Sequence, residues 1–351
     1  MQGPDAAAAA RLIEGMPKAE LHMHLEGSIE PERMFALAQR NGVKLPWATV
    51  EECRAAYRFG DLAAFLKIYY EGCQVLLAEQ DFFDLAWDYL QRVHGENVVH
   101  AEVFLSAQAN TRRGVPLGAM VEGVDAALKQ ARDRFGMTGA LLLGMQRHFG
   151  ADDAMATLEE ARPWRDRIAG IGLGGAELPY PPALFERAFA HARELGWRTM
   201  CHAGEEGPAS YVADAVDVLK VDRIDHGVHC DQDPALVERL AGMQVPLTIC
   251  PISNVMLGVY PSMREHNIAK LLRAGLKVTV NSDDPSYFAG YMNENFRQVQ
   301  QAHGLGEAEL YVLARNAFDA SFLPQEDKAA RIAELDRYWD ACGAQRPRAV
   351  Q

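Results

Sequence analysis

Two histidines near the start of the chain have the spacing of metal ligands. His22 and His24 fall in a stretch from Glu20 to Leu25 whose residues are typical of a buried strand. Side chains at alternate positions of a strand point to the same face, so this stretch would direct two imidazoles into one volume. The alternative is a chance pair on an exposed strand edge. Burial without partners would be costly for two imidazoles, which favours a metal site.

The segment His202-Ala203-Gly204-Glu205 places a histidine at the end of an expected strand and a carboxylate three residues later. The glycine allows the backbone to turn sharply between them. A second interpretation is the start of a helix, where Glu205 and Glu206 would be first-turn acids favoured by the helix dipole. Both interpretations hold together if Glu206 is structural and Glu205 takes part in the chemistry.

A third candidate group is Asp225-His226-Gly227. A lone histidine on an apolar strand is more often a hydrogen-bonded core residue than a functional one, so His226 gains weight only beside the other groups. Asp225 is its immediate neighbour and should point to the opposite face of the strand. We therefore expect Asp225 to be a structural partner rather than a site residue.

Two adjacent carboxylates follow an apolar stretch in Asn281-Ser282-Asp283-Asp284-Pro285. Such a pair repels unless a cation or a proton relieves it. The alternative is a capped turn before a helix, where aspartate and proline are common.

Considered together, three neutral imidazoles and one carboxylate suit a single Zn²⁺ per chain with one open position for water. These ligands would be His22, His24, His202 and Asp283. The ion would lower the pKa of the water toward about 7. An acid, a base and an orienting group for hydrolytic deamination of an aromatic ring would then come from Glu205, His226 and Asp284.

These residues need a scaffold that brings the ends of strands together. Short β-rich runs alternate with helical runs, and the expected strands are 20–25, 98–105, 140–147, 168–173, 198–203, 223–227, 246–250 and 277–282. Helical patterns cover 185–195, 211–219, 236–241 and 268–274. Such alternation predicts an α/β fold, either a (β/α)8 TIM barrel or a doubly wound sheet.

The placement of the polar residues favours the barrel, because its chemistry gathers at the C-terminal ends of the strands. A long helical insert, 51–92, follows the first strand and is the best candidate for a lid. The tail after Asn293 predicts helices packed on the outside. With no repeat or low-complexity linker, residues 1–351 are expected to form a single domain.

Composition limits the partners. The chain has 351 residues, 49% of them hydrophobic, and a formal net charge of -13, which argues against general nucleic-acid binding and anionic membranes but suits a small neutral substrate. Six cysteines without a C-x-x-C pair predict free thiols in a reducing compartment. Nothing approaches the roughly 20 apolar residues of a membrane span, and 6–10 makes a poor signal peptide. We expect a cytoplasmic protein whose oligomeric state stays open.

The motifs together resemble the adenosine/adenine deaminase family of the amidohydrolase superfamily. The resemblance extends in order from about Pro17 to about Ala330. It is carried by Pro17-Lys18-Ala19-Glu20-Leu21-His22-Met23-His24-Leu25-Glu26-Gly27, His202-Ala203-Gly204-Glu205, Arg223-Ile224-Asp225-His226-Gly227, Cys250-Pro251-Ile252-Ser253-Asn254 and Ser282-Asp283-Asp284-Pro285. It implies a (β/α)8 barrel with a mononuclear zinc site at His22, His24, His202 and Asp283.

The resemblance also implies the roles of the remaining groups. Glu205 would donate a proton to N1 of a purine, which makes C6 electrophilic. His226 would orient and deprotonate the attacking water, and Asp284 would be the partner of N7. Water adds to C6, the amine leaves and a 6-oxopurine results, with stabilisation directed at the transition state.

The substrate expected from the resemblance is a free purine base. Adenosine deaminases usually have H-L-D-G where this chain has Glu26, whose longer side chain could fill the ribose space. The segments 205–208 and 81–87 resemble the adenine deaminase branch. One departure lies at 173–177, which reads L-G-G-A-E where adenine deaminases commonly read L-D-S-x-E. Gly175 has no side chain to contact the base, so it would offer only its backbone N–H to N3. The smaller residues would enlarge the pocket, which suggests N6-alkyl adenines as alternative substrates. The segment 59–70 would then form a wall around the N6 substituent; the other interpretation of this segment is ordinary helix packing.

Two other classes of enzyme fit the sequence less well. Cytidine-deaminase enzymes need P-C-x-x-C, which this chain lacks. Amidohydrolases with two metals often carry a bridging Lys or Glu on the fourth strand, and 168–173 has neither. An adenosine deaminase and a barrel that binds without catalysis remain as alternatives.

Overall fold

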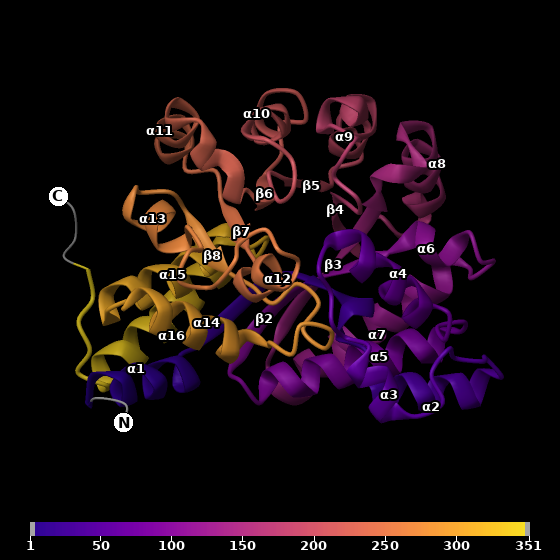
Figure 1. Ribbon diagram of the computed structural model, residues 1–351, viewed down its shortest axis with the longest axis horizontal. Helices are drawn as coiled ribbons and strands as arrows, with labels where there is room; N and C mark the ends of the chain where they lie inside the picture. The colour runs from indigo at the N-terminus through magenta and orange to yellow at the C-terminus, as the bar shows by residue number, and fades with distance from the viewer. Residues whose placement is uncertain (1–3, 348–351) are drawn as a thin grey trace.

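Eight parallel strands form one sheet at the centre of the computed structural model, which describes residues 4–347. Their order in the sheet follows their order in the chain (Figure 1). The strands are β1 (Lys18–His24), β2 (Val98–Ser106), β3 (Thr138–Gln146), β4 (Ile168–Gly174), β5 (Arg198–Ala203), β6 (Arg223–His226), β7 (Leu247–Ile249) and β8 (Val278–Val280). All eight expected strands are present, with ends that differ from the expected ones by no more than two residues.

The sheet closes into a barrel through contacts between the first strand and the residues that follow the last. Met23 forms an isolated parallel bridge with Asp283. The His24 N–H donates to the carbonyl of Asp283 at 2.8 Å, and the Asp283 N–H donates to the carbonyl of His22 at 3.1 Å. Asn281 adds a side-chain acceptor for the Leu21 N–H at 2.9 Å. The predicted (β/α)8 barrel is therefore confirmed, and the doubly wound sheet is excluded.

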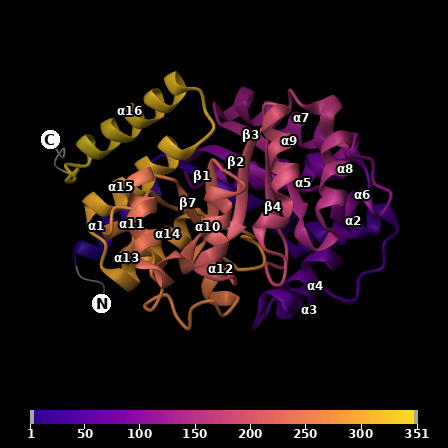
Figure 2. The ribbon, with the colours of Figure 1, turned by 90° about the horizontal axis from the view of Figure 1, so that it is seen from above.

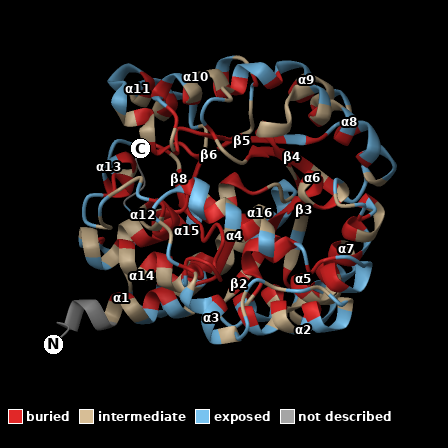
Figure 3. Cartoon of the chain, turned by 45° about the vertical axis from the view of Figure 1, so that its right-hand side comes forward, coloured by how far each residue is buried: buried red, intermediate tan, exposed pale blue. Residues whose placement is uncertain are grey.

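Helices surround the strands as a ring, with buried residues gathered on the strands and on the helix faces turned toward them (Figure 3). The helices are α1 (Pro4–Gly15), α2 (Pro31–Asn41), α3 (Val50–Ala55), α4 (Leu62–Cys73), α5 (Glu79–His94), α6 (Ala107–Thr111), α7 (Leu117–Phe135), α8 (Ala151–Ala161), α9 (Glu186–Glu194), α10 (Ala209–Asp217), α11 (Pro234–Met243), α12 (Pro251–Met256), α13 (Ile268–Arg273), α14 (Met292–His303), α15 (Glu307–Ala320) and α16 (Gln325–Ala341). The four helices expected between later strands correspond to α9, α10, α11 and α13.

The insert after β1 divides into parts with different tasks. α5 packs against α7 on the outside of the barrel, whereas α4 lies across the middle of the ring (Figure 3). The Asp61 carboxylate caps α4 by accepting from the Ala64 N–H at 2.7 Å. Leu62, Phe65 and Tyr69 recur at helical spacing and are buried. The lid expected in this insert is thus confined to α4 and the residues beside it.

The opposite end of the barrel is closed by the C-terminal region. α16 lies at the other end of the molecule from α4 and α12 (Figure 2), and α15 packs on β8 and β1. Between α15 and α16, the Phe322 N–H donates to Glu102 at 2.5 Å. Glu102 also accepts a hydrogen bond from the buried Arg223 guanidinium at 2.6 Å. The same guanidinium stacks on the Phe322 ring, with its Cζ atom 4.0 Å from the ring centre. A buried ion pair and an aromatic ring therefore fill this end, which leaves the other end for chemistry.

The cysteines are unpaired, and only Cys342 is exposed. Among the described residues, none of the helices combines the length and apolar character that crossing a bilayer requires.

Candidate functional site

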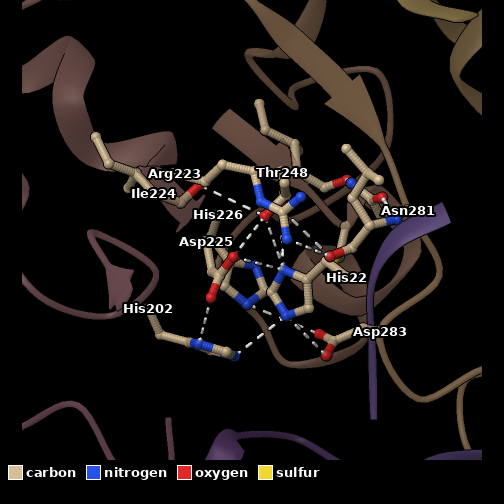
Figure 4. Close-up of polar contacts among 12 residues, drawn as sticks. His22, His202, Arg223, Ile224, Asp225, His226, Thr248, Asn281 and Asp283 are labelled. Atoms are coloured by element: carbon tan, nitrogen blue, oxygen red, sulfur yellow. Dashed lines mark hydrogen bonds and ion pairs between the residues drawn. The ribbon is translucent and has the colours of Figure 1, made fainter. Parts of the chain in front are cut away.

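Four side chains predicted as metal ligands converge at the C-terminal ends of β1, β5 and β8. One donor atom from each of His22, His24, His202 and Asp283 lies within 4.8 Å of all the others. The Nε2 atom of His202 is 3.1 Å from Nε2 of His22 and 3.3 Å from Nε2 of His24. The Asp283 Oδ1 atom is 3.5 Å from Nε2 of His22 (Figure 4) and 3.4 Å from Nε2 of His24.

These separations fit one ion. Two ligand atoms that each lie about 2.0–2.1 Å from a tetrahedral ion are roughly 3.3 Å from each other. The Nδ1 atom of His22 is held by the carbonyl of Thr248 at 3.2 Å and its hydroxyl at 3.1 Å, so the lone pair of Nε2 faces the other ligands. Nitrogen lone pairs turned toward one point repel unless a cation lies between them. The donor set of three imidazoles and a carboxylate is one that zinc prefers.

Burial favours neutral imidazoles at this point. It lowers the pKa of His22 below its ordinary value and lowers that of His24 to about 3. A neutral imidazole is the form that binds a metal. A second set, in which Cys250 and His226 join His22 and Asp283, has similar spacing. Burial and the nearby Asp283 raise the pKa of the Cys250 thiol well above its usual range, so this set is the poorer one.

The expected position of Asp225 was wrong. Its Oδ2 atom lies 3.3 Å from Nδ1 of His202, and its Oδ1 atom accepts from the Thr248 hydroxyl at 2.8 Å (Figure 4). Asp225 therefore points into the barrel beside His202, its register partner on β5. Strict alternation would then direct His226 outward, but His226 has a φ of 61° and reaches the site as well. The left-handed backbone breaks the alternation that the sequence argument assumed.

A chain of hydrogen bonds fixes the proton of His226. The Ile268 N–H donates to Nδ1 of His266 at 3.1 Å, so Nε2 of His266 carries the proton and donates to Oδ1 of Asn254 at 3.2 Å. The amide of Asn254 then donates to Nδ1 of His226 at 3.1 Å. A neutral His226 consequently carries its proton on Nε2, which lies 3.6 Å from Glu205 Oε2. In this tautomer His226 is a hydrogen-bond donor to the site, so the predicted role in deprotonating water does not suit it.

Glu205 is held in place by a carboxylate that the sequence argument did not assign. Glu177 accepts backbone N–H bonds from Gly204 at 2.6 Å, Glu205 at 3.0 Å, Glu206 at 2.7 Å and Gly207 at 2.8 Å. Burial, Asp283 and Glu177 raise the pKa of Glu205 well above its ordinary value, which favours the protonated form that a proton donor needs. The helix-start interpretation of Glu205 and Glu206 was wrong, since α10 begins only at Ala209.

The pKa values of the paired aspartates Asp283 and Asp284 are shifted in opposite directions. Burial alone would raise the pKa of Asp283, but His22, His226 and His24 lower it below its ordinary value. Burial and the adjacent Asp283 raise the pKa of Asp284 well above its ordinary value. A φ of 65° at Asp283 lets both side chains reach the site. The turn that was the alternative is also present, since residues 285–289 form a turn ahead of α14.

A cavity opens from the four ligands toward α4. Asp284, Glu205, His226 and Gly175 line it, and Gly175 has a φ of 81° that favours glycine. Apolar and aromatic residues of α4 cover it: Leu62, Phe65, Leu66, Tyr69 and Tyr70. The predicted position of the lid residues is thus correct.

Glu26 does not line this cavity. Its buried carboxylate accepts from the Ser106 N–H at 3.0 Å, the Asn110 amide at 2.9 Å and the Tyr69 hydroxyl at 3.3 Å. The prediction that Glu26 occupies ribose space is therefore replaced by a positioning role, because Ser106 and Tyr69, which it holds, do line the cavity.

Sequence reasoning missed Asn254, His266, Thr248 and Glu177. Two of them, Asn254 and Glu177, stand in segments that the motif comparison had quoted, which was the signal available. Glu177, Asn254 and Thr248 bond to residues 27, 28 and 226 positions away, and His266 bonds to Asn254 12 positions away, so no local pattern indicates the pairing.

Comparisons with known proteins identify the family of the chain. The family model described as "Adenosine deaminase" matches residues 17–338. Adenine deaminase of Cupriavidus necator is 53% identical over 335 residues, 95% of each chain. That of Hahella chejuensis is 52% identical over 326 residues, 93% of this chain and 98% of the relative.

Solved structures show the same likeness. The crystal structure of adenine deaminase from Arthrobacter aurescens has a TM-score of 0.91 at 44% identity and covers 93% of this chain and 100% of that one. A zinc-bound amidohydrolase from Burkholderia ambifaria has a TM-score of 0.87 at 30% identity, covering 97% and 96% of the two chains.

Proposed function

The chain belongs to the adenosine deaminase family, and from that membership we propose that it is an adenine deaminase that hydrolyses adenine to hypoxanthine and ammonia. The observation that carries this assignment is the identity of 52–53% to proteins named adenine deaminase over nearly the whole chain. Those relatives do not favour the N6-alkyl adenine alternative. The substrate is thus a small purine base, and one catalytic barrel spanning the family match accounts for the activity.

The residues that would hold a zinc ion, one per chain, are His22, His24, His202 and Asp283. The support is that their donor atoms lie within 4.8 Å of one another and that their separations match tetrahedral coordination. When bound, zinc would activate a water molecule at neutral pH.

The other residues act on the base. Glu205 donates its proton to N1, which removes electron density from C6 and makes that carbon electrophilic. His226, with its proton on Nε2, orients the attacking water by a hydrogen bond. Asp284 contacts N7, and the N–H of Gly175 donates to N3. Addition of water at C6 and loss of ammonia then give the 6-oxopurine, and the groups at C6 stabilise the charge that develops there.

A panel of 6-aminopurines tests this function. The purified protein loaded with zinc should convert adenine to hypoxanthine, and the loss of adenine absorbance measures this conversion. Turnover of adenosine and of N6-isopentenyladenine should be much slower. A chelator should abolish turnover, and zinc should restore it. Equal or better turnover of adenosine would overturn the free-base assignment, and a zinc-loaded protein inert on every aminopurine would indicate a binding barrel instead.

A further inference from the structure

The end of β3 contributes a polar side chain to the cavity that the reaction scheme does not use. Gln146 lines the cavity and is only 6% exposed. Its backbone N–H donates to Gln108 at 2.6 Å, and its side-chain Nε2 donates to the Tyr70 hydroxyl at 3.1 Å. Its Oε1 atom has no hydrogen-bond partner among the described residues.

An unpartnered carbonyl oxygen in this position restricts what can face it. Buried acceptors in folded proteins almost always have a donor, because leaving one unpaired is costly. The amide is placed with Nε2 toward the Tyr70 hydroxyl, which leaves Oε1 as the end without a partner. A ligand that fills this part of the cavity must therefore present an N–H or O–H group toward Oε1.

The order of the strands identifies that group; this step depends on the proposed function. Glu205 follows β5, Gly175 follows β4, Gln146 ends β3, Ser106 ends β2 and Asp284 follows β8. Around a purine whose C6 faces the metal ligands, the nitrogens run N1, N3, N9 and N7. With N1 at Glu205, N3 at Gly175 and N7 at Asp284, the N9 atom falls in the sector between Gly175 and Asp284.

Among the polar side chains of that sector, Gln146 is the one that has an acceptor atom without a partner among the described residues. The hydroxyl of Ser106 is hydrogen-bonded to that of Tyr69 at 2.8 Å. Gln146 is the neighbour of Gly174 in the β3–β4 register, next to the expected N3 contact. We propose that Oε1 of Gln146 accepts the N9–H of the free base and that Gln146 is a specificity residue which selects bases without an N9 substituent.

The chemistry gives the direction of selection. A free 6-aminopurine can carry hydrogen on N9, whereas a nucleoside or an N9-alkyl purine cannot. Binding such a compound leaves Oε1 unpaired in addition to crowding it. Sites built to hydrogen-bond a substrate N–H reject analogues that lack it far more strongly than apolar pockets reject an extra methyl group.

The experiment compares adenine with 9-methyladenine in the zinc-loaded enzyme and in three variants. Gln146→Leu removes the acceptor at similar volume, and we expect kcat/KM for adenine to fall about 10- to 100-fold while that for 9-methyladenine changes little. Gln146→Glu keeps an acceptor and should retain the preference for adenine. Gln80→Leu, the same change at an exposed residue of the outer helix α5, should leave the ratio between the two substrates as in the unchanged enzyme.

The inhibition constants of hypoxanthine and 9-methylhypoxanthine measure the same preference for a base without an N9 substituent. They can be determined even where 9-methyladenine is not turned over. Zinc content and thermal unfolding identify a variant that fails to fold. An unchanged ratio in Gln146→Leu, or an equal loss of the ratio in Gln80→Leu, would overturn the role of Gln146. Absence of any aminopurine turnover by the unchanged enzyme would instead overturn the proposed function.

Discussion

The carboxylate of Asp225 lies 3.3 Å from Nδ1 of His202, and both side chains are buried beside the converging donor atoms. A carboxylate in this position fixes the tautomer of a metal-binding imidazole and increases its basicity. The same carboxylate accepts from Thr248, whose hydroxyl and carbonyl hold His22. One residue thus supports two of the proposed ligands.

The first prediction follows from this contact. Asp225→Asn should weaken zinc binding about 10- to 100-fold, because the amide no longer offers His202 a charged acceptor. Competition with a chromophoric chelator measures the affinity directly. Asp217→Asn, an identical change at an exposed residue paired with Arg239, should leave the affinity unchanged. Equal zinc affinity in the two variants would contradict the role of Asp225.

The second prediction concerns the proton of His226. In Asn254→Asp the carboxylate would accept from Nδ1 of His226, so the neutral ring would carry its proton on the wrong nitrogen. We expect kcat to fall by about 100-fold or more, as wrong tautomers do elsewhere, with zinc content preserved. Asn316→Asp is the matched control, since its amide also donates a single bond, to the Val278 carbonyl, on a helix outside the barrel. A kcat like that of the control would exclude the tautomer argument.

The third prediction concerns the space beside Asp284. A methyl group added at Gly27 would overlap the Asp284 carboxylate and lie 2.6 Å from its Cβ atom. Gly27→Ala should therefore displace Asp284 and lower kcat/KM for adenine about 100-fold, the cost of a shift of roughly 1 Å at a reacting site. At Gly242 the same methyl group meets nothing within 4 Å, so Gly242→Ala should keep full activity. Full activity in Gly27→Ala would show that Asp284 can move without cost.

The fourth prediction is a pH dependence of stability at the closed end of the barrel. Burial alone would raise the pKa of Glu102, but Arg223 and His100 lower it below its ordinary value. The ionised carboxylate therefore stabilises the fold above the ordinary pKa near 4.5, and this contribution is lost as the pH falls through the lower value of the folded protein.

The variant Glu102→Gln tests that contribution. At neutral pH it should lower the free energy of unfolding by about 3–5 kcal/mol, because Arg223 is left buried without its partner. The difference in melting temperature between the variant and the unchanged protein should narrow as the pH falls below the ordinary pKa near 4.5. Glu159→Gln, at an exposed carboxylate paired with His191, should shift stability by no more than about 0.5 kcal/mol. A constant difference at all pH values would contradict the assignment.

Much of the fold and of the candidate ligand set followed from the sequence because the information is local. Alternating β-rich and helical runs defined the strands to within two residues. Polar residues at the C-terminal ends of those strands must lie close together, since the C-terminal ends of all strands in a parallel barrel face the same way. His22, His24, His202 and Asp283 could therefore be grouped without coordinates.

The tertiary structure decided which side chains face which. Left-handed backbone at His226 and Asp283 directs adjacent residues into one site, contrary to simple alternation, so that His226 reaches the site as well as Asp225. Glu26 does not line the cavity, because its carboxylate accepts hydrogen bonds from three donors on other elements. Gln146 does line the cavity, and its Oε1 atom has no partner among the described residues. Such pairings join residues that lie far apart in the chain. They depend on strand register and backbone dihedrals, which exist only once the barrel has closed.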